Sequence, residues 1–462
     1  MTSVAANPDC NVAEAARRAT VAGLREKLAR LGGLAGAAAS PAQAAAAAAL
    51  RARAREAPPP PRMPGFEPCS TAAGTAWVRS VRVDLRALLD AAGATHLGSA
   101  PDLLALTCAA APDAAPEPGG DVAVLDIESL GLRGSGVVAF LVGVGIQRHT
   151  ALDVHQVLLV DPGAEAAQLH AVLDRLDGAA ALVTYNGRSF DVPALRARCI
   201  VNRLGDRGLE GRPHCDLLGP VRRLFRDRLG ACTLRQAEME LLAMDRVEDV
   251  PGFEAPARYR AWLRGAGPEV LAGVIRHNEL DLCATAVLGA RLLAHVEGDM
   301  VGPVHAADRY RLAVHLERRG ADQPRSERLL RDTVAAEHGP WDRRAAHRLA
   351  ARLRRAGEAG EREALHLWRT LWRADPGDLR AARALAIALE RARLLDEAIA
   401  VCERSLHHCA AMPPWRHAAM RGAPAGGWQH DWSRRLARLQ ARRIRQSRHA
   451  PPGVASLLTA VS

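Results

Sequence analysis

The sequence predicts an α/β domain, with a mixed sheet flanked by helices, followed by an all-α domain of helical repeats. Two observations support this prediction. From residue 121, three apolar strand-like runs are followed by alternating strand and helix patterns, which is typical of a mixed sheet covered by helices. Beyond residue 300 the apolar residues recur with the helical period alone, so only helices are expected there.

The α/β domain begins with three strand candidates, VAVLDI, VVAFLVGVGI and LDVHQVLLV, joined by short connections. Short connections suit an antiparallel run. The expected order then runs through a helix at about 163–177, a strand at 180–185, a helix at about 189–204, a weaker strand at 214–218, and helices to roughly residue 295.

The helical part contains repeated units of helix, turn and helix. Two units are clear, the first of which closes with ADPGD, and a third candidate spans 305–337. Their spacing is close to the 34 residues of a tetratricopeptide repeat. The repeats are a candidate binding site for a protein partner.

These patterns divide the chain into five segments. They are 1–69, an N-terminal helix (12–31) with a partly disordered Ala/Pro-rich linker; 70–120, a short hairpin and linker that lead into the core; 121–297, the α/β domain; 298–411, the helical repeats; and 412–462, a basic C-terminal segment.

Composition limits the classes to which this protein can belong. Nine cysteines without a CxxC pair indicate reduced thiols. Neither a signal peptide nor an apolar run of about 18 residues is visible, so a cytoplasmic protein with no membrane contact is expected. There is no GxxxxGK[ST] loop for ATP, and VGVGIQ lacks the third glycine of a dinucleotide site.

The positive charge is concentrated in the last third of the chain. The net charge is +11, and residues 298–462 hold 30 basic against 18 acidic side chains. Such an excess attracts polyanions, although it also occurs on solvated helix faces.

Two carboxylates close the first strand candidate, where Asp126 and Glu128 lie two residues apart. Positions i and i+2 of a strand point to the same face. Like charges side by side repel unless something positive lies between them. The simple interpretation is a strand that has left the core, with both acids in water; the alternative is a metal site.

Three further residues favour the metal site when they are considered together. Asp191 follows the fourth strand in TYNGRSFD, at a helix start where aspartate is common. His277 and Asp281 are four residues apart on a periodic helix and share a face, as surface pairs also do. With Asp126 and Glu128 they supply four carboxylates and an imidazole.

This set of donors suits two hard divalent cations, Mg²⁺ or Mn²⁺, rather than zinc. Two such ions about 4 Å apart can hold the attacking and the leaving oxygen of a phosphodiester displacement. A nearby histidine could take the proton from the attacking water. Asp216, close to the fifth strand, is interpreted as structural, with support of the site as the lesser alternative.

The motifs LDIESLGL, VTYNGRSFDVPALRARC and HNELDLCATAVL resemble the three motifs of ribonuclease-H-like DEDD exonucleases. The segments between them look like the YprB-type branch of that superfamily, over about 121–295, with a weaker match at 74–85. The resemblance implies a ribonuclease-H-like fold, a general base at His277, and metal ligands at Asp126, Glu128, Asp191 and Asp281. Three residues separate His277 from Asp281, the spacing of the tyrosine type of these enzymes, whereas the histidine type usually has four.

The leading hypothesis is a metal-dependent nuclease that releases nucleotides from a 3′ end of DNA or RNA by two-metal hydrolysis. One alternative is a nucleic-acid-binding scaffold with a weak or inactive nuclease core and protein-recruiting repeats; another is a structure-specific endonuclease. The segment 412–462 has nine arginines and Trp415, Trp428 and Trp432. It suits either a grip on nucleic acid or a helix that caps the repeats with its tryptophans inward.

Overall fold

The computed structural model describes most of the chain from residue 62 onward. The described residues are 62–107, 120–131, 137–205, 208–209, 211–246, 249–298, 305–336, 339–412, 424 and 427–448. The predicted helix at 12–31, most of the Ala/Pro-rich linker, the segment 108–119, Trp415 and the last residues of the chain lie outside them.

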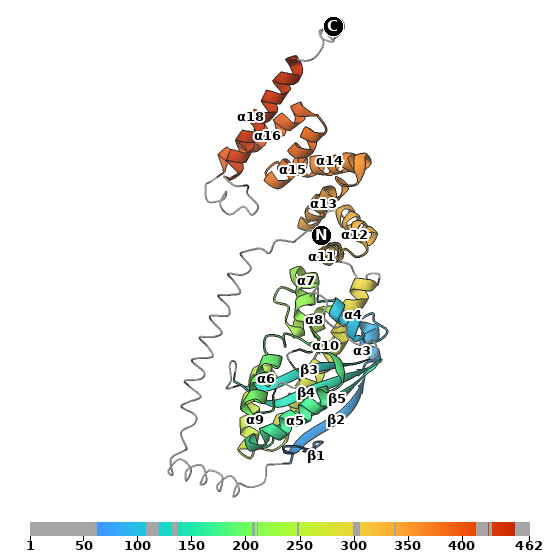
Figure 1. The fold of residues 1–462 in the computed structure, drawn as a ribbon, viewed down its shortest axis with the longest axis vertical. Helices are drawn as coiled ribbons and strands as arrows, with labels where there is room; N and C mark the ends of the chain where they lie inside the picture. The colour runs from blue at the N-terminus through green and yellow to red at the C-terminus, as the bar shows by residue number, and fades with distance from the viewer. Residues whose placement is uncertain are drawn as a thin grey trace, which may run out of the picture. The chain divides into compact units, whose positions relative to one another are not determined.

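Within the described residues, a seven-stranded sheet forms the centre of the α/β domain, in the order β1-β2-β5-β4-β3-β6-β7 (Figure 1). The strands are β1 (Glu67–Thr71), β2 (Gly74–Asp84), β3 (Asp121–Leu130), β4 (Val138–Arg148), β5 (Ala151–Leu158), β6 (Ala179–Thr184) and β7 (His214–Asp216). From β1 to β3 along this order the pairs are antiparallel, whereas β6 is parallel to both β3 and β7. The predicted mixed sheet and its antiparallel start are confirmed, and the upstream hairpin joins the same sheet.

Helices cover both faces of this sheet. Helices α5 (Glu165–Leu176) and α6 (Asp191–Val201) share an apolar cluster with one face, and α10 (Glu269–Glu297) packs across the other. The remaining helices of the domain are α3 (Arg86–Ala91), α4 (Ala100–Ala105), α7 (Leu218–Leu229), α8 (Leu234–Leu241) and α9 (Ala255–Leu263). Short 3-10 turns precede α5, at Pro162–Ala164, and α9, at Gly252–Glu254.

Strand β3 lies inside the sheet and is buried on both faces. Val122 and Val124 belong to the cluster that contains α10, and Ala123 and Leu125 belong to the one that contains α5 and α6. A strand covered on both faces is apolar at successive positions rather than at alternate ones. This burial explains the run VAVL, and it places the carboxylates that follow at the edge of the core.

The C-terminal region is all-helical. Its described helices are α11 (Ala306–Arg318), α12 (Gln323–Ala335), α13 (Pro340–Leu353), α14 (Gly357–Ala374), α15 (Leu379–Arg391), α16 (Leu395–Ala411) and α18 (Gly427–Arg448). From α11 to α16 they form three helix pairs in which each helix packs against the next, so the region fits the predicted helical repeats. Their identity as tetratricopeptide repeats stays a prediction. Among the described helices, none combines the length and the apolarity needed to cross a bilayer.

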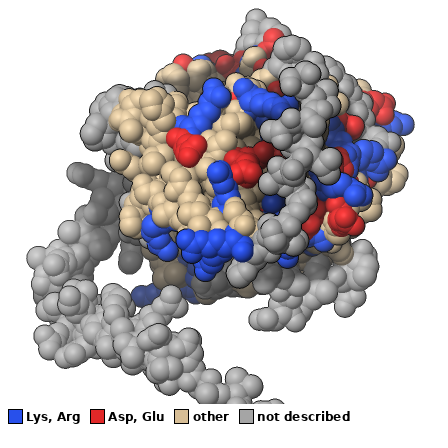
Figure 2. All heavy atoms as spheres, turned by 90° about the horizontal axis from the view of Figure 1, so that it is seen from above, with Lys and Arg blue, Asp and Glu red and all other residues tan. Residues whose placement is uncertain are grey.

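Helix α18 packs against α16 and closes the described repeats. Trp428 and Trp432 are buried, with 3% and 0% of their surface exposed. Several arginines of α18 form ion pairs with the repeats, as Arg438 does with Glu390 at 2.6 Å. Figure 2, which views the molecule from above, likewise shows basic side chains beside acidic ones. The cap interpretation of this helix is therefore favoured, because these tryptophan faces are not available to bases.

The C-terminal end of α10 contacts the repeats, since Arg325 of α12 donates to the backbone carbonyl of His295 at 3.4 Å. His295 is 2% exposed, and its ring lies 4.7 Å from that of Phe225 on α7. Burial, reinforced by the positive charges of Arg291, Arg325 and Arg228, lowers the pKa of His295 to about 3. Burial also lowers the pKa of His315 on α11 to about 4. Both imidazoles are therefore neutral in the folded protein at neutral pH.

We expect acid to destabilise this junction. The unfolded chain binds a proton at His295 below its ordinary pKa of about 6.5, while the folded chain does not. The free energy of unfolding should therefore fall by roughly 3 kcal/mol between pH 7 and pH 4 through this residue alone. Urea unfolding at both pH values measures the change. In His295→Leu the free energy of unfolding should fall less on acidification, by that amount. An equal fall in the variant and the unmodified protein would contradict the lowered pKa of His295.

Candidate metal centre

The first two site residues lie near the end of β3. Glu128 is buried and Asp126 is partly buried, so neither is simply a solvated acid beyond the core. Strand β6 runs parallel to β3, with Val124 opposite Val183. The two carboxyl ends therefore meet at one edge of the sheet, and the segment after β6 starts beside Asp126.

A tight turn carries the chain from β6 to Asp191, the first residue of α6. Asp216, at the end of β7, accepts hydrogen bonds from the backbone N–H groups of Asn186 and Arg188, at 2.8 and 3.1 Å. Asp191 in turn accepts a hydrogen bond from the N–H of Ile127 at 3.1 Å. Asp216 thus has the structural role that was expected, because it fixes the turn that brings Asp191 to β3.

Helix α10 supplies His277 and Asp281 from the opposite face. The Nε2 atom of His277 lies 3.6 Å from Asp281 and 3.9 Å from Glu128. Between them on the helix, Asn278 is fully buried and donates to the carboxylate of Asp126 at 2.8 Å. The structure therefore gathers all five predicted site residues, from β3, α6 and α10, into one cluster.

A buried arginine and two further acids complete the surroundings of the cluster. Arg246, in the segment between α8 and α9, forms ion pairs with Glu238, Asp249 and Asp281. Asp249 accepts from Nδ1 of His277 at 2.9 Å. This contact fixes the imidazole so that its other nitrogen, Nε2, is directed toward Glu128 and Asp281.

Burial and mutual repulsion shift the pKa values of these acids. Burial, together with the charges of Asp281 and Asp191, raises the pKa of Asp126 well above its usual value. Burial also raises the pKa of Glu128 to about 8, although His277 opposes this, and the pKa of Asp191 to about 7. The cluster therefore has too little positive charge for its carboxylates, and a bound cation would stabilise their ionised forms.

Comparison with known proteins agrees with this geometry. Residues 123–293 match the family model described as the RNase_H superfamily. Those residues form a ribonuclease-H-like domain. The chain is also 29% identical over 294 residues to the uncharacterized protein YprB of Bacillus subtilis (strain 168), covering 62% of this chain and 69% of that protein. This alignment is longer than the match to the family model.

A solved structure, the family B DNA polymerase from the hyperthermophilic archaeon Pyrobaculum calidifontis, aligns with 45% of this chain at 17% identity. The chain covers 30% of the length of that polymerase, with a TM-score of 0.30. A likeness this slight carries no argument.

The donor set of the ribonuclease-H-like domain fits a divalent metal in its chemistry. Four carboxylates suit Mg²⁺ or Mn²⁺, and the raised pKa values of Asp126 and Glu128 mark a site that lacks positive charge. In the described part of the chain, no three His, Cys, Asp or Glu side chains lie in the arrangement of a bound ion. Instead the guanidinium of Arg246 neutralises Asp281.

Sequence reasoning missed Arg246, Asp249 and Asn278. Asn278 lies within the motif HNELD, so its position next to His277 was a usable signal. Arg246 and Asp249 belong to the segment before α9, whose sequence has no periodic pattern. Their contacts with α10 span about 30 residues and depend on tertiary packing.

Glycine 143 explains why a helix can approach the sheet at this point. Gly143, on β4, pairs with Asp126, and a Cβ atom there would overlap Asn278 and Leu282 of α10. Asn278 cannot move aside freely, because it is also hydrogen-bonded to Gln156 at 2.9 Å. The glycines of VGVGIQ therefore serve packing in the ribonuclease-H-like domain.

We expect Gly143→Ala to disturb the ribonuclease-H-like domain at its centre. The added methyl must displace Asn278 or α10, which should lower the free energy of unfolding by roughly 1–3 kcal/mol. Chemical denaturation measures this loss. Gly219→Ala in α7 is the matched control, because a Cβ there meets only Arg223 at 3.8 Å. Equal stability of the two variants would show that the contact between β4 and α10 tolerates a side chain.

Proposed function

We propose that this protein hydrolyses phosphodiester bonds of nucleic acid as a metal-dependent nuclease, acting as a 3′–5′ exonuclease. The observation that carries the proposal is the convergence of Asp126, Glu128, Asp191 and Asp281 around His277 in a ribonuclease-H-like domain. The exonuclease assignment rests on the three motifs that contain these residues.

In this proposal Asp126, Glu128, Asp191 and Asp281 would hold two Mg²⁺ or Mn²⁺ ions, and such ions would supply charge stabilisation for the oxygens of a phosphodiester displacement. His277 accepts the proton of the attacking water at Nε2. Asp249 keeps Nδ1 of His277 protonated and the ring oriented, since it accepts a hydrogen bond there. Asn278 orients the carboxylate of Asp126, to which it donates.

A second candidate is a nucleic-acid-binding scaffold whose nuclease core is weak or inactive, with repeats that recruit a protein partner. The ion pair of Arg246 with Asp281 favours it, because a buried guanidinium there competes with a metal for that carboxylate. Arg246 is only 4% exposed, so a metal would have to bind beside it or displace it.

The deciding experiment is incubation of the purified protein with single- and double-stranded DNA and RNA, labelled at the 3′ or the 5′ end, with Mg²⁺, Mn²⁺ or a chelator. A 3′–5′ exonuclease should release mononucleotides first from the 3′ label and shorten the 5′-labelled strand stepwise. Internal products from both labels would indicate an endonuclease. Binding without cleavage under all conditions would favour the scaffold.

A further inference from the structure

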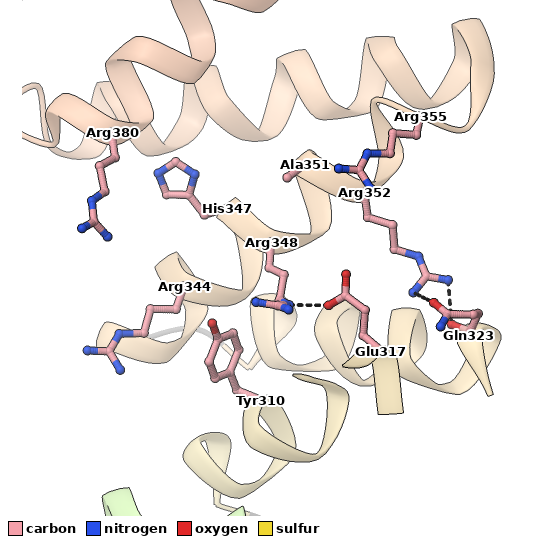
Figure 3. Close-up of a pocket in the computed structure, with 10 residues that line it drawn as sticks. All are labelled: Tyr310, Glu317, Gln323, Arg344, His347, Arg348, Ala351, Arg352, Arg355 and Arg380. Carbon is pink, nitrogen blue, oxygen red and sulfur yellow. Dashed lines mark hydrogen bonds and ion pairs between the residues drawn. The ribbon is translucent and has the colours of Figure 1, made fainter. Parts of the chain in front are cut away.

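A groove of about 740 Å³ lies on the helical repeats, away from the five site residues, and is lined by residues of α11, α12, α13 and α15 and by Arg355 just after α13 (Figure 3). Its charged lining is strongly unbalanced. The groove contains one acid, Glu317, and five arginines, which are Arg344, Arg348, Arg352, Arg355 and Arg380. Part of the positive charge of the C-terminal third therefore lies in this groove.

The acids of the repeats neutralise only part of this charge. Arg348 pairs with Glu317, and Arg352 lies 3.3 Å from Glu327 and donates to Gln323 at 2.8 Å. Arg344 and Arg355 are exposed, and the ion pairs found among the described residues include neither of them. An exposed guanidinium without a carboxylate partner is available to bind an anion.

The arginines are also regularly spaced. Arg344, Arg348 and Arg352 occupy positions i, i+4 and i+8 of α13, and therefore share one face of the helix with steps of about 6 Å. Arg355 follows just beyond the end of α13. A row of cations at even steps suits a polymer with regularly repeated anions better than a single small anion.

Aromatic rings lie beside this row. Tyr310 lines the groove, its ring centroid is 5.6 Å from that of Trp341, and Arg344 lies over Trp341 at 4.5 Å. His347 also lines the groove, and its buried Nε2 has no hydrogen-bond partner in the described part of the chain. Rings together with arginines provide faces on which bases stack. An acidic peptide would use the arginines but has no need of the rings.

We propose that this surface, which we call the repeat groove, binds single-stranded nucleic acid, with Arg344 and Arg355 contacting its phosphates. The inference deepens the proposed function, on which the choice of nucleic acid as ligand rests. It assigns binding of the strand to the groove between α11, α12, α13 and α15, because the tryptophans of α18 are buried and cannot stack on bases.

The test is fluorescence anisotropy of a labelled oligo(dT) of about 20 nucleotides with the full chain in a chelator, at several salt concentrations. The variant Arg344→Glu/Arg355→Glu should bind roughly tenfold more weakly at low salt. Its slope of log affinity against log salt should fall by about 1.4, since each contact with a single strand contributes about 0.7.

The matched control is Arg328→Glu/Arg362→Glu, which makes the same change of net charge at two exposed arginines of the repeats that do not line the groove. It should change affinity by less than about twofold and leave the slope intact. Equal binding by the two double variants would overturn the proposal. So would tighter binding of a labelled octaglutamate peptide that depends on Arg344 and Arg355, because the ligand would then be an acidic protein segment.

The outcome is separable from that of the nuclease proposal. The binding assay runs in a chelator, so its result does not depend on cleavage at the carboxylate cluster. If the groove variant binds more weakly but no form of the protein cleaves nucleic acid, the proposal for the repeat groove stands and the nuclease proposal is wrong. If the protein cleaves nucleic acid but the groove variant binds as tightly as the unmodified protein, the nuclease proposal stands and the proposal for the repeat groove is wrong.

Discussion

Asp126→Asn should abolish cleavage, with a loss of roughly 10³-fold or more, the upper range for removing one electrostatic contact to a transition state. The substitution keeps the volume of the side chain but removes one charge from the proposed ligand set. It also removes repulsion, because the charges of Asp281, Asp191 and Glu128 act on Asp126. The metal-free variant should therefore be at least as stable as the unmodified protein, and Mn²⁺ should raise the melting temperature of the unmodified protein alone.

Asp121→Asn is the matched control for this prediction. Asp121 begins the same strand, and it is exposed and paired with Arg148 at 2.6 Å on the surface, where such a pair is worth little. Its activity and its stabilisation by Mn²⁺ should be unchanged. Full activity of Asp126→Asn at saturating Mn²⁺ would exclude Asp126 as a ligand. Loss of its fold would contradict the argument from repulsion.

The sheet could be predicted because its signals are local. The run VAVL before Asp126 and the short connections between the next strands specify buried, antiparallel neighbours without knowledge of the rest of the chain. The junction between the two domains had no such signal. At that junction Arg325 donates to the backbone carbonyl of His295, 30 residues away, and nothing in either segment predicts this contact.

The acids of the candidate site could be named from sequence because each lies beside a predictable element. Asp126 and Glu128 end a strand, Asp191 begins a helix, and His277 and Asp281 share a helical face. The groups that surround them could not be found this way. Arg246 lies in an irregular segment and reaches Asp281 through tertiary packing, so only the structure reveals that this carboxylate has a buried cationic partner.

The basic C-terminal segment illustrates the same limit. Arginines and tryptophans in one amphipathic helix predict a binding face and a cap equally well, because the pattern does not say which side is covered. Burial of Trp428 and Trp432 decides between them. The arginines of the repeat groove gave no comparable motif, since Arg344 and Arg380 come from different helices and meet only in the folded protein.

His277→Ala should lower turnover by roughly 10²–10⁴-fold, the usual range for a positioned acid–base group. The physical reason is the position of Nε2, which faces Glu128 and Asp281 while Nδ1 donates to Asp249. Single-turnover rates at saturating metal and substrate measure the loss in the chemical step. Turnover within about twofold of the unmodified protein would mean that another group takes the proton.

Asp249→Asn tests whether that acid acts through the histidine. An asparagine has no negative charge with which to orient the imidazole of His277. Turnover should therefore fall by roughly 10–100-fold, the usual effect of removing a residue that hydrogen-bonds to a site histidine. Asp245→Asn, an exposed acid four residues earlier that pairs only with Arg235 among the described residues, should have no effect. If Asp249 acts by positioning His277, the double variant His277→Ala/Asp249→Asn should be no slower than His277→Ala. Losses that multiply would show instead that Asp249 acts independently, through its ion pair with Arg246.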